Sequence, residues 1–333
     1  MRLRASRSAW ALVGLVAAAA LPGLAAAGEP AATQLRVNVF PGFSNLALFA
    51  AQAKGFFARR GLEVQVQFTA NSQEQREGLA KGAFQIAHAA VDNAVAMVEL
   101  AKADAVIVMG GDSGMNNLFV QPEIRSYADL RGKTVIVDAP NTAYALLLYK
   151  MLRKNGLGRG DYTVKPIGGT SLRLEAMRKE KSYAATMLNP PFSVIAEMEG
   201  LRNMGLAVQV VGPYQGPGMF VMRPWAQANA ETLVRYIQAH VEGLRWALAP
   251  ANKAEAVALV ADRLKLSPDV AAKAYVAVAD PAGGLARDAR FDAEGFRNAL
   301  KLRAEIEGQW GGTPPPAERY FDLSFYDRAL SGL

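Results

Sequence analysis

Apolar residues come in short runs separated by helical patterns, and the order of these patterns repeats after 98 residues. The stretch Glu77–Asn93 (EGLAKGAFQIAHAAVDN) contains a helical pattern followed by a short apolar run, and Glu175–Pro191 (EAMRKEKSYAATMLNPP) has the same order. The shift also holds upstream, where Val66 falls on Val164. Self-similarity at this spacing predicts two lobes of like architecture rather than a solenoid, whose repeats are roughly 20 to 50 residues long.

Each copy reads as strands that alternate with helices. The predicted strands cover residues 35–40, 63–68, 85–90, 105–109, 118–121, 134–137, 163–167 and 184–188. The predicted helices between them begin near residues 46, 72, 92, 143 and 170. Short apolar strands separated by helices of about a dozen residues predict βαβ units, hence an α/β fold with a mainly parallel sheet flanked by helices in each lobe.

Two polar, glycine-rich segments are suited to crossing between the lobes. The sequence GGDSGMNN follows residue 109, and residues 208–217 form a return crossing. Lobe 1 then comprises residues 35–113 and 218–333, and lobe 2 comprises residues 114–217. From residue 229 onward the pattern is helical, with a proline-rich connector at 313–316 and a short final helix at 324–330.

Residues 1–27 have the three parts of a secretory signal. Three arginines among the first seven residues precede an apolar core, Ala9–Leu21, and a small-residue cleavage site, Ala25–Ala27. The core of about 13 residues is too short to span a bilayer as one helix. No cysteine follows it, so we expect a periplasmic protein that is released by cleavage and carries no lipid anchor.

Composition narrows the chemistry. The net charge of +7 falls to +4 without the three signal arginines, and basic residues are interspersed with acidic ones, so we expect no nucleic-acid partner. The chain has no cysteine and two histidines, His88 and His240, which excludes disulfides and thiol nucleophiles and argues against a histidine-rich metal site. An all-oxygen calcium or magnesium site stays open, although no EF-hand loop motif occurs. We expect a monomer without a cofactor.

Polar side chains follow the predicted strands where ligands bind in such sheets, beyond the carboxyl ends of the strands. In lobe 1 these candidates are Ser44, Asn45, Asn71, Ser72, His88, Asp92 and Asn93. From the crossing and lobe 2 come Asn116, Asn141, Thr142 and Asn189. Asparagine offers two donors and an acceptor without net charge, so it can hold a polar solute without the cost of a buried ion.

Apolar walls and one cation complete the candidate site. The residues suited to stacking an aromatic solute are Phe43, Met115, Tyr144, Phe192 and Tyr214. Arg173 lies in the first turn of a predicted helix, where it either clamps an anionic group or is simply an exposed helix residue.

A GDSG sequence at residues 111–114 is also found in chymotrypsin-like proteases. Those enzymes need a histidine and an aspartate on a closed β-barrel, whereas the pattern here is α/β. The sequence offers no nucleophile–base set at a telling spacing, so we expect a binding protein rather than an enzyme.

Three stretches carry a resemblance to a known family: LRVNVFPGFSNLALFAAQAKGFFARRGLEVQVQF, EGLAKGAFQIAHAAVDN and YADLRGKTVIVDAPNTAYALLLYKMLRKNGL. Over residues 35–310 the chain resembles periplasmic solute-binding proteins of nitrate-, sulfonate- and taurine-type ABC importers. The same fold occurs in fungal thiamine-pyrimidine synthases, whose iron-binding cysteines have no counterpart here. These families commonly carry G-x-x-D where this chain has Gly82–Gln85, and a second aspartate where it has Tyr183.

The resemblance implies a two-lobed periplasmic binding protein fold of type II-like organisation, with a helical C-terminal region. It also implies an ABC permease and an ATPase at the inner membrane as partners, and a small solute trapped in the cleft by hinge closure. We expect an aromatic or heterocyclic solute, neutral or mono-anionic. Two alternatives remain open: a sulfonate, taurine or nitrate anion, or an enzyme of the thiamine-pyrimidine synthase type.

Overall fold

The computed structural model describes residues 31–281 and 283–333, and its strands form two five-stranded sheets. The predicted signal, residues 1–27, lies outside the described residues. The strands are β1 (Thr33–Val39), β2 (Leu62–Phe68), β3 (Ile86–Ala90), β4 (Ala105–Met109), β5 (Asn117–Val120), β6 (Thr134–Val137), β7 (Thr163–Pro166), β8 (Tyr183–Leu188), β9 (Arg202–Leu206) and β10 (Pro217–Met222).

The first sheet has the strand order β2-β1-β3-β10-β4. Strand β1 pairs in parallel with β2 and β3, so that Val37 lies between Val66 and Ile86. Strand β10 arrives from far along the chain and pairs antiparallel with both β3 and β4. The prediction of a mainly parallel sheet is therefore confirmed, with one antiparallel strand inserted near its edge.

The second sheet repeats this arrangement in the order β7-β6-β8-β5-β9. Strand β6 pairs in parallel with β7 and β8, and β5 pairs antiparallel with β8 and β9. Each strand from β1 to β4 has its counterpart about 98 residues later, from β6 to β9. The two sheets thus have the same order once β10 and β5 are exchanged, as expected for two copies of one pattern.

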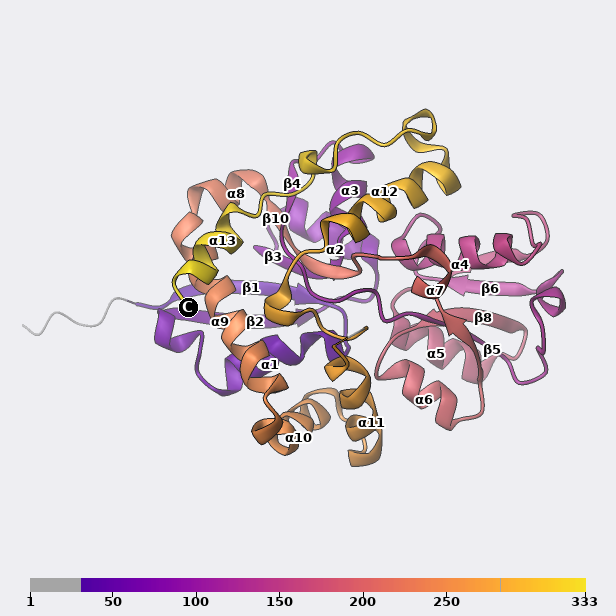
Figure 1. The fold of residues 1–333 in the computed structure, drawn as a ribbon, viewed down its shortest axis with the longest axis horizontal. Helices are drawn as coiled ribbons and strands as arrows, with labels where there is room; N and C mark the ends of the chain where they lie inside the picture. The colour runs from indigo at the N-terminus through magenta and orange to yellow at the C-terminus, as the bar shows by residue number, and fades with distance from the viewer. Residues whose placement is uncertain (1–30, 282) are drawn as a thin grey trace, which may run out of the picture. The chain divides into compact units, whose positions relative to one another are not determined.

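Helices cover both faces of each sheet (Figure 1). They are α1 (Leu46–Ala53), α2 (Ser72–Ala80), α3 (Asp92–Glu99), α4 (Ala143–Lys154), α5 (Thr170–Lys179), α6 (Phe192–Met198), α7 (Val208–Val211), α8 (Arg223–Ala228), α9 (Ala230–Leu248), α10 (Lys253–Leu264), α11 (Pro268–Ala279), α12 (Ala293–Glu307) and α13 (Ser324–Ser331). In the second sheet, Val135 and Val137 of β6 pack under α4, whereas Ile136 packs with α5 and α6. This alternation of side chains along a strand explains why buried strands are apolar throughout. In the described part of the chain, no helix is long and apolar enough to cross a membrane.

Helix α9 packs closely against α1 at Gly243 (Figure 1). A Cβ atom at this position would lie 2.3 Å from the carbonyl oxygen of Ala47 and 2.8 Å from the backbone nitrogen of Ala51. Both helices are apolar on the facing sides, where Phe49, Ala50 and Ile237 are buried. The absence of a side chain at Gly243 therefore sets how near α9 approaches the first sheet.

The predicted elements agree with the structure except near the return crossing. Residues 208–211, read as part of that crossing, form the short helix α7. Strands β9 and β10 were not predicted. Asn45 precedes α1 but does not cap it with its side chain, because its Nδ2 donates instead to the carbonyl oxygens of Phe40 and Gly42. Asn71 caps α2 by accepting a hydrogen bond from the backbone of Glu74.

Candidate functional site

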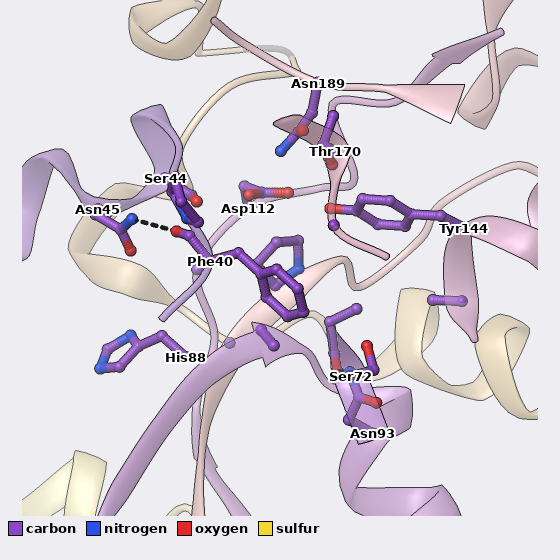
Figure 2. Close-up of a pocket in the computed structure, with 18 of the residues that line it drawn as sticks. Phe40, Ser44, Asn45, Ser72, His88, Asn93, Asp112, Tyr144, Thr170 and Asn189 are labelled. Carbon is purple, nitrogen blue, oxygen red and sulfur yellow. Dashed lines mark hydrogen bonds between the residues drawn. The ribbon is translucent and has the colours of Figure 1, made fainter. Parts of the chain in front are cut away.

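A cavity of about 80 Å³ lies where the carboxyl ends of strands from both sheets come together (Figure 2). One water-sized group needs roughly 10–15 Å³ by this kind of measure, so the cavity can hold a small molecule of several such groups. From the first sheet the lining includes the loops that follow β1, β2 and β3, and from the second those that follow β6, β7 and β8. This is the edge where ligands bind in parallel α/β sheets.

Backbone hydrogen bonds join the loops of the two sheets around the cavity. The backbone nitrogen of Phe43 donates to the carbonyl oxygen of Pro190 at 3.2 Å. The backbone nitrogen of Gly169 donates to the carbonyl oxygen of Ala70 at 2.7 Å. The approach is close because Gly168 has φ of +110° and a Cβ there would lie 2.9 Å from the same oxygen. These contacts enclose the cavity.

Arg173 is 1% exposed and its guanidinium is engaged by neutral acceptors. It donates to the hydroxyl oxygens of Thr186 and Thr170 at 2.9 and 3.3 Å, and to two carbonyl oxygens, of Gly168 at 2.6 Å and Met187 at 3.0 Å. Burial lowers its pKa, an effect opposed by Asp138 and Tyr144. The alternative of an exposed helix arginine is wrong: Arg173 is buried and lines the cavity, where it binds the loops that end β7 and β8.

Two histidines line the cavity on the side of the first sheet, and a tyrosine contacts one of them. The rings of His88 and His240 stack with centroids 5.0 Å apart, and His88 Nε2 lies 3.0 Å from the hydroxyl oxygen of Tyr236. Burial lowers the pKa of His240 to about 4 and that of His88 well below its usual value. Both imidazoles are therefore neutral near pH 7, so this wall carries no positive charge.

Carboxylates contribute the acidic part of the cavity. Asp138 accepts hydrogen bonds from the backbone nitrogen of Ser72, at 3.3 and 3.2 Å, and so links the two sheets. Asp112 is 3% exposed, and burial raises its pKa to about 7 against the opposing hydrogen bonds from the backbones of Gly114 and Met115. Within residues 31–281 and 283–333, no group of three histidine, aspartate or glutamate side chains is placed to hold a metal ion.

Three buried polar atoms in the lining have no hydrogen-bond partner among the residues that the structure describes. They are Oδ1 of Asn93, Oδ1 of Asn189 and Nδ1 of His240. A buried polar atom without a partner costs about 1–3 kcal/mol, so such atoms are rare in protein interiors. Their gathering at one cavity indicates that a bound molecule would satisfy them.

Comparison with known proteins adds the family. The sequence profile described as NMT1/THI5 like matches residues 43–254, more than half of the 333 residues. The chain belongs to the NMT1/THI5-like family. No curated protein matches the sequence.

Solved structures share the fold of this NMT1/THI5-like chain at low sequence identity. A protein of Bordetella bronchiseptica RB50 is 20% identical, with a TM-score of 0.79, over 90% of this chain and 98% of its own. The alkanesulfonate-binding protein SsuA from Xanthomonas axonopodis pv. citri, bound to MOPS, is 19% identical, with a TM-score of 0.71, over 89% and 99% of the chains. The periplasmic nitrate-binding protein NrtA from Synechocystis PCC 6803 is 13% identical, with a TM-score of 0.75, over 91% and 89%. The predicted family resemblance is thereby confirmed.

The structure brings nine of the predicted site residues of this NMT1/THI5-like chain to the cavity. These are Ser44, Asn45, Ser72, His88, Asn93, Thr142, Tyr144, Arg173 and Asn189. Their role in binding stays a prediction. Figure 2 shows Asn189, Thr170 and Tyr144 on one side of the cavity, and Ser44, His88 and Asn93 on the other.

Eight predicted residues do not line the cavity: Phe43, Asn71, Asp92, Met115, Asn116, Asn141, Phe192 and Tyr214. The apolar ones pack in the cores: Phe43 and Met115 in the core beneath α1, Tyr214 and Phe192 in those of the second sheet. The ring of Tyr214 lies so close to Gly114 that a Cβ there would be 2.9 Å from it. The predicted aromatic walls are thus corrected to Phe40 and Tyr144 (Figure 2).

The polar residues outside the cavity make structural contacts, although the two polar side-chain atoms of Asn116 have no hydrogen-bond partner among the described residues. Asn71 caps α2. Asp92 pairs with Arg303 of α12 at 2.7 Å, and the same Arg303 nitrogen donates to the carbonyl oxygen of Asn141 at 3.1 Å. The backbone oxygen of Asn116 accepts from Ala207 at 2.9 Å where the crossings run side by side.

Sequence reasoning missed the contribution of the C-terminal region to the lining. His240 and Leu244 come from α9, and Leu285 and Ala289 from the segment before α12. Strand-end reasoning cannot find them, because they follow no strand. The one available signal was His240, one of only two histidines in the chain. Asp112 was overlooked because it lies in the GGDSG crossing segment.

Proposed function

We propose that this chain is the solute-binding component of an ABC importer and that it works in the periplasm with a permease and an ATPase. The observation that carries the proposal is the enclosed cavity at the strand ends of both sheets, lined by buried polar atoms without partners. Family membership and the alkanesulfonate-binding and periplasmic nitrate-binding structural neighbours support it. Binding needs shaped polar groups and apolar walls, and this lining has both.

Entry of a solute requires the two sheets to separate. The bonds from Phe43 to Pro190 and from Gly169 to Ala70 enclose the cavity and must break for a solute to enter. Two segments connect the sheets, residues 110–116 and 207–216. A hinge motion at these crossings would open the cavity and closure would trap the solute.

The solute that fits this lining is a small aromatic or heterocyclic molecule. Of the neutral and the mono-anionic alternatives, the lining favours the neutral one. Phe40 and Tyr144 offer aromatic faces in the cavity. Arg173, the cation in the lining, already donates to four acceptors of its own protein. An anion would have to compete with those acceptors and would face the buried carboxyl of Asp112.

We propose no catalysis for this site. Ser44 and His88 both line the cavity, but His88 Nε2 already contacts the hydroxyl of Tyr236. A nucleophile needs a base within hydrogen-bond reach, and no such contact to Ser44 is present among the described residues. A bound solute should therefore be recovered unchanged after prolonged incubation, and conversion would contradict the proposal.

A thermal-shift panel tests the proposed function. The purified chain is heated with nucleobases, thiamine precursors, aromatic acids, sulfonates or nitrate. A solute present at 100 times its dissociation constant stabilises the protein by about 2.7 kcal/mol, which raises the melting temperature by several degrees. A shift confined to sulfonates or nitrate would identify an anion receptor instead. No shift with any member would count against a solute-binding role of this kind.

Two asparagines, one following each sheet's third strand, test the cavity itself. We expect Asn93→Ala and Asn189→Ala each to weaken binding of a panel solute roughly three- to thirtyfold, because each removes hydrogen bonds worth about 0.5–1.5 kcal/mol or more. The melting temperature without solute should change little, since Oδ1 of both residues has no partner in the described part of the chain and Asn93 loses only the 3.2 Å hydrogen bond from its Nδ2 to the carbonyl oxygen of Ala90.

A double-mutant cycle on the two asparagines, measured by calorimetry, adds a test of closure. The two substitutions should be non-additive for binding and additive for stability without solute. Asn155→Ala, on the loop after α4 and outside the cavity lining, is the control and should keep full affinity. Unchanged affinity in both single variants would mean that solute binds elsewhere.

A further inference from the structure

Asp112 is a buried carboxyl in the cavity wall, and no ion pair of the described residues includes it. Asp92 is another buried aspartate, but it pairs with Arg303 at 2.7 Å. The influences on the Asp112 carboxyl are burial and two backbone hydrogen bonds, with no cation among them. A buried carboxylate without a cation is costly. Asp112 lies in the cavity wall rather than in the core, so a bound ligand could offset this cost.

A structural role explains the hydrogen bonds of Asp112 but not its charge. Its Oδ1 accepts a hydrogen bond from the backbone nitrogen of Gly114 at 2.7 Å, and its backbone pairs with Gly216 and Pro217. These contacts hold the two crossings together. An asparagine would keep the contact of Oδ1 with Gly114 and both backbone pairings, since its Oδ1 accepts in the same way. The negative charge is therefore not needed for the turn.

The other free groups of the cavity are mainly acceptors. Oδ1 of Asn93 and Oδ1 of Asn189 can only accept a hydrogen bond, and neither has a donor within residues 31–281 and 283–333. Arg173 directs its donors to protein oxygens. Figure 2 shows the Tyr144 hydroxyl directed toward the part of the cavity where Asp112 lies. Burial raises the Tyr144 pKa, and the Asp112 charge raises it further. A molecule that satisfies this lining has to donate hydrogen bonds.

We propose that Asp112 determines the charge of the solute: the cavity takes an aromatic or heterocyclic molecule that presents N–H donors, neutral or cationic, and rejects carboxylates and sulfonates. This inference rests on the proposed function and narrows its substrate class. It also sets this chain apart from its alkanesulfonate-binding and nitrate-binding structural neighbours.

Among the side chains that line the cavity, Asp112 is the one expected to respond to pH near neutrality, whereas Asp92, whose pKa burial raises to about 6, lies outside the lining. The titratable and charged side chains around the cavity are His88, Asp138, Tyr144, Arg173, Tyr214 and His240. Burial lowers the pKa of both histidines and raises the pKa of both tyrosines, so all four are neutral around pH 7. Lowering the pH through about 7 protonates Asp112 and should weaken the binding of a cationic solute.

Three probes of one size and shape test the inference: benzamidine, benzamide and benzoate, which are cationic, neutral and anionic. Calorimetry at pH 8 should give the affinity order benzamidine, benzamide, benzoate. In Asp112→Asn we expect benzamidine to bind roughly ten- to a hundredfold more weakly, as for a lost hydrogen bond to a charged group, and benzoate to bind no worse. Asp262→Asn, an exposed aspartate of α10, is the charge-matched control and should behave like the unchanged chain.

The unchanged chain supplies a second measurement that does not depend on the variant folding. Benzamidine affinity should fall between pH 8 and pH 6, and this fall should be absent from Asp112→Asn. Equal affinities for benzamidine and benzoate, or a preference unaltered by Asp112→Asn, would overturn the inference. If only anions of the solute panel bind, the inference fails and the solute-binding role stands. If no solute and no probe binds, the proposed function has failed and the inference fails with it.

Discussion

Arg303→Met is expected to lower the free energy of unfolding by about 3–5 kcal/mol at pH 8, because it leaves Asp92 as a buried charge without a partner. Asp92 and Arg303 are each almost fully buried and lie 2.7 Å apart. The loss should shrink at lower pH. Burial already raises the Asp92 pKa to about 6 even with Arg303 opposing it, so removal of Arg303 favours the neutral acid further. Urea unfolding followed by circular dichroism at pH 8 and pH 5 measures both effects.

The double variant Asp92→Asn/Arg303→Met provides the decisive comparison for this ion pair. It removes both charges, so most of the lost stability should return. Lys179→Met breaks an exposed pair with Glu175 in α5 and should change stability by less than about 0.5 kcal/mol. A double variant as unstable as Arg303→Met would show that the contact of Arg303 with the Asn141 carbonyl, rather than its charge, is what matters.

Gly243→Val is expected to destabilise the chain by about 3 kcal/mol, the upper end of the usual cost of overpacking. The added Cβ would lie 2.3 Å from a carbonyl oxygen of α1, and backbone atoms cannot move aside as a side chain can. The helix α9 must shift instead and carry His240 and Leu244 away from the cavity lining. Thermal unfolding measures the loss of stability, and calorimetry with a panel solute measures the accompanying loss of affinity.

Gly78→Val is the matched control for this helix contact. Gly78 is also a helical glycine, in α2, and a Cβ there would meet the ring of Phe84 at 2.6 Å. A ring can rotate or shift, so the expected loss is about 1 kcal/mol, with solute affinity retained. Equal losses at both glycines would indicate that helix propensity, rather than the approach of α9 to α1, governs the effect.

Strands that are buried on both faces were the most predictable part of the fold. AVIVM and TVIV form β4 and β6 at the predicted residues, because continuous apolar β-branched runs fit a covered sheet. RNMGL and PGMFVM form β9 and β10 but carry glycine, asparagine or proline, and β9 is an edge strand with an exposed first half. These two segments form strands because β9 pairs with β5 and β10 pairs with β3. Pairing with partners so distant in the sequence leaves no local pattern.

The candidate site divided along the same line. Ser72, Asn93 and Asn189 follow strands, and the topology of parallel sheets brings such residues to one edge. The direction in which a side chain points from a loop does not follow from the topology of the sheet. The sequence could therefore not tell that Phe40 rather than Phe43 faces the cavity. His240 reaches the cavity only through the packing of α9 on α1, which depends on the whole first lobe.

The insertion of β10 between β3 and β4 sets an order in which the chain can complete its sheets. The second sheet consists of one continuous stretch, from Asn117 to Leu206, so all its strands exist once that stretch has emerged from the ribosome. The first sheet begins earlier, yet β4 has no strand partner until residues 217–222 arrive. Until then β3 and β4 present unpaired edges, the kind of surface on which chains misassociate. The half of the protein that is synthesised first is thus the half that finishes folding last.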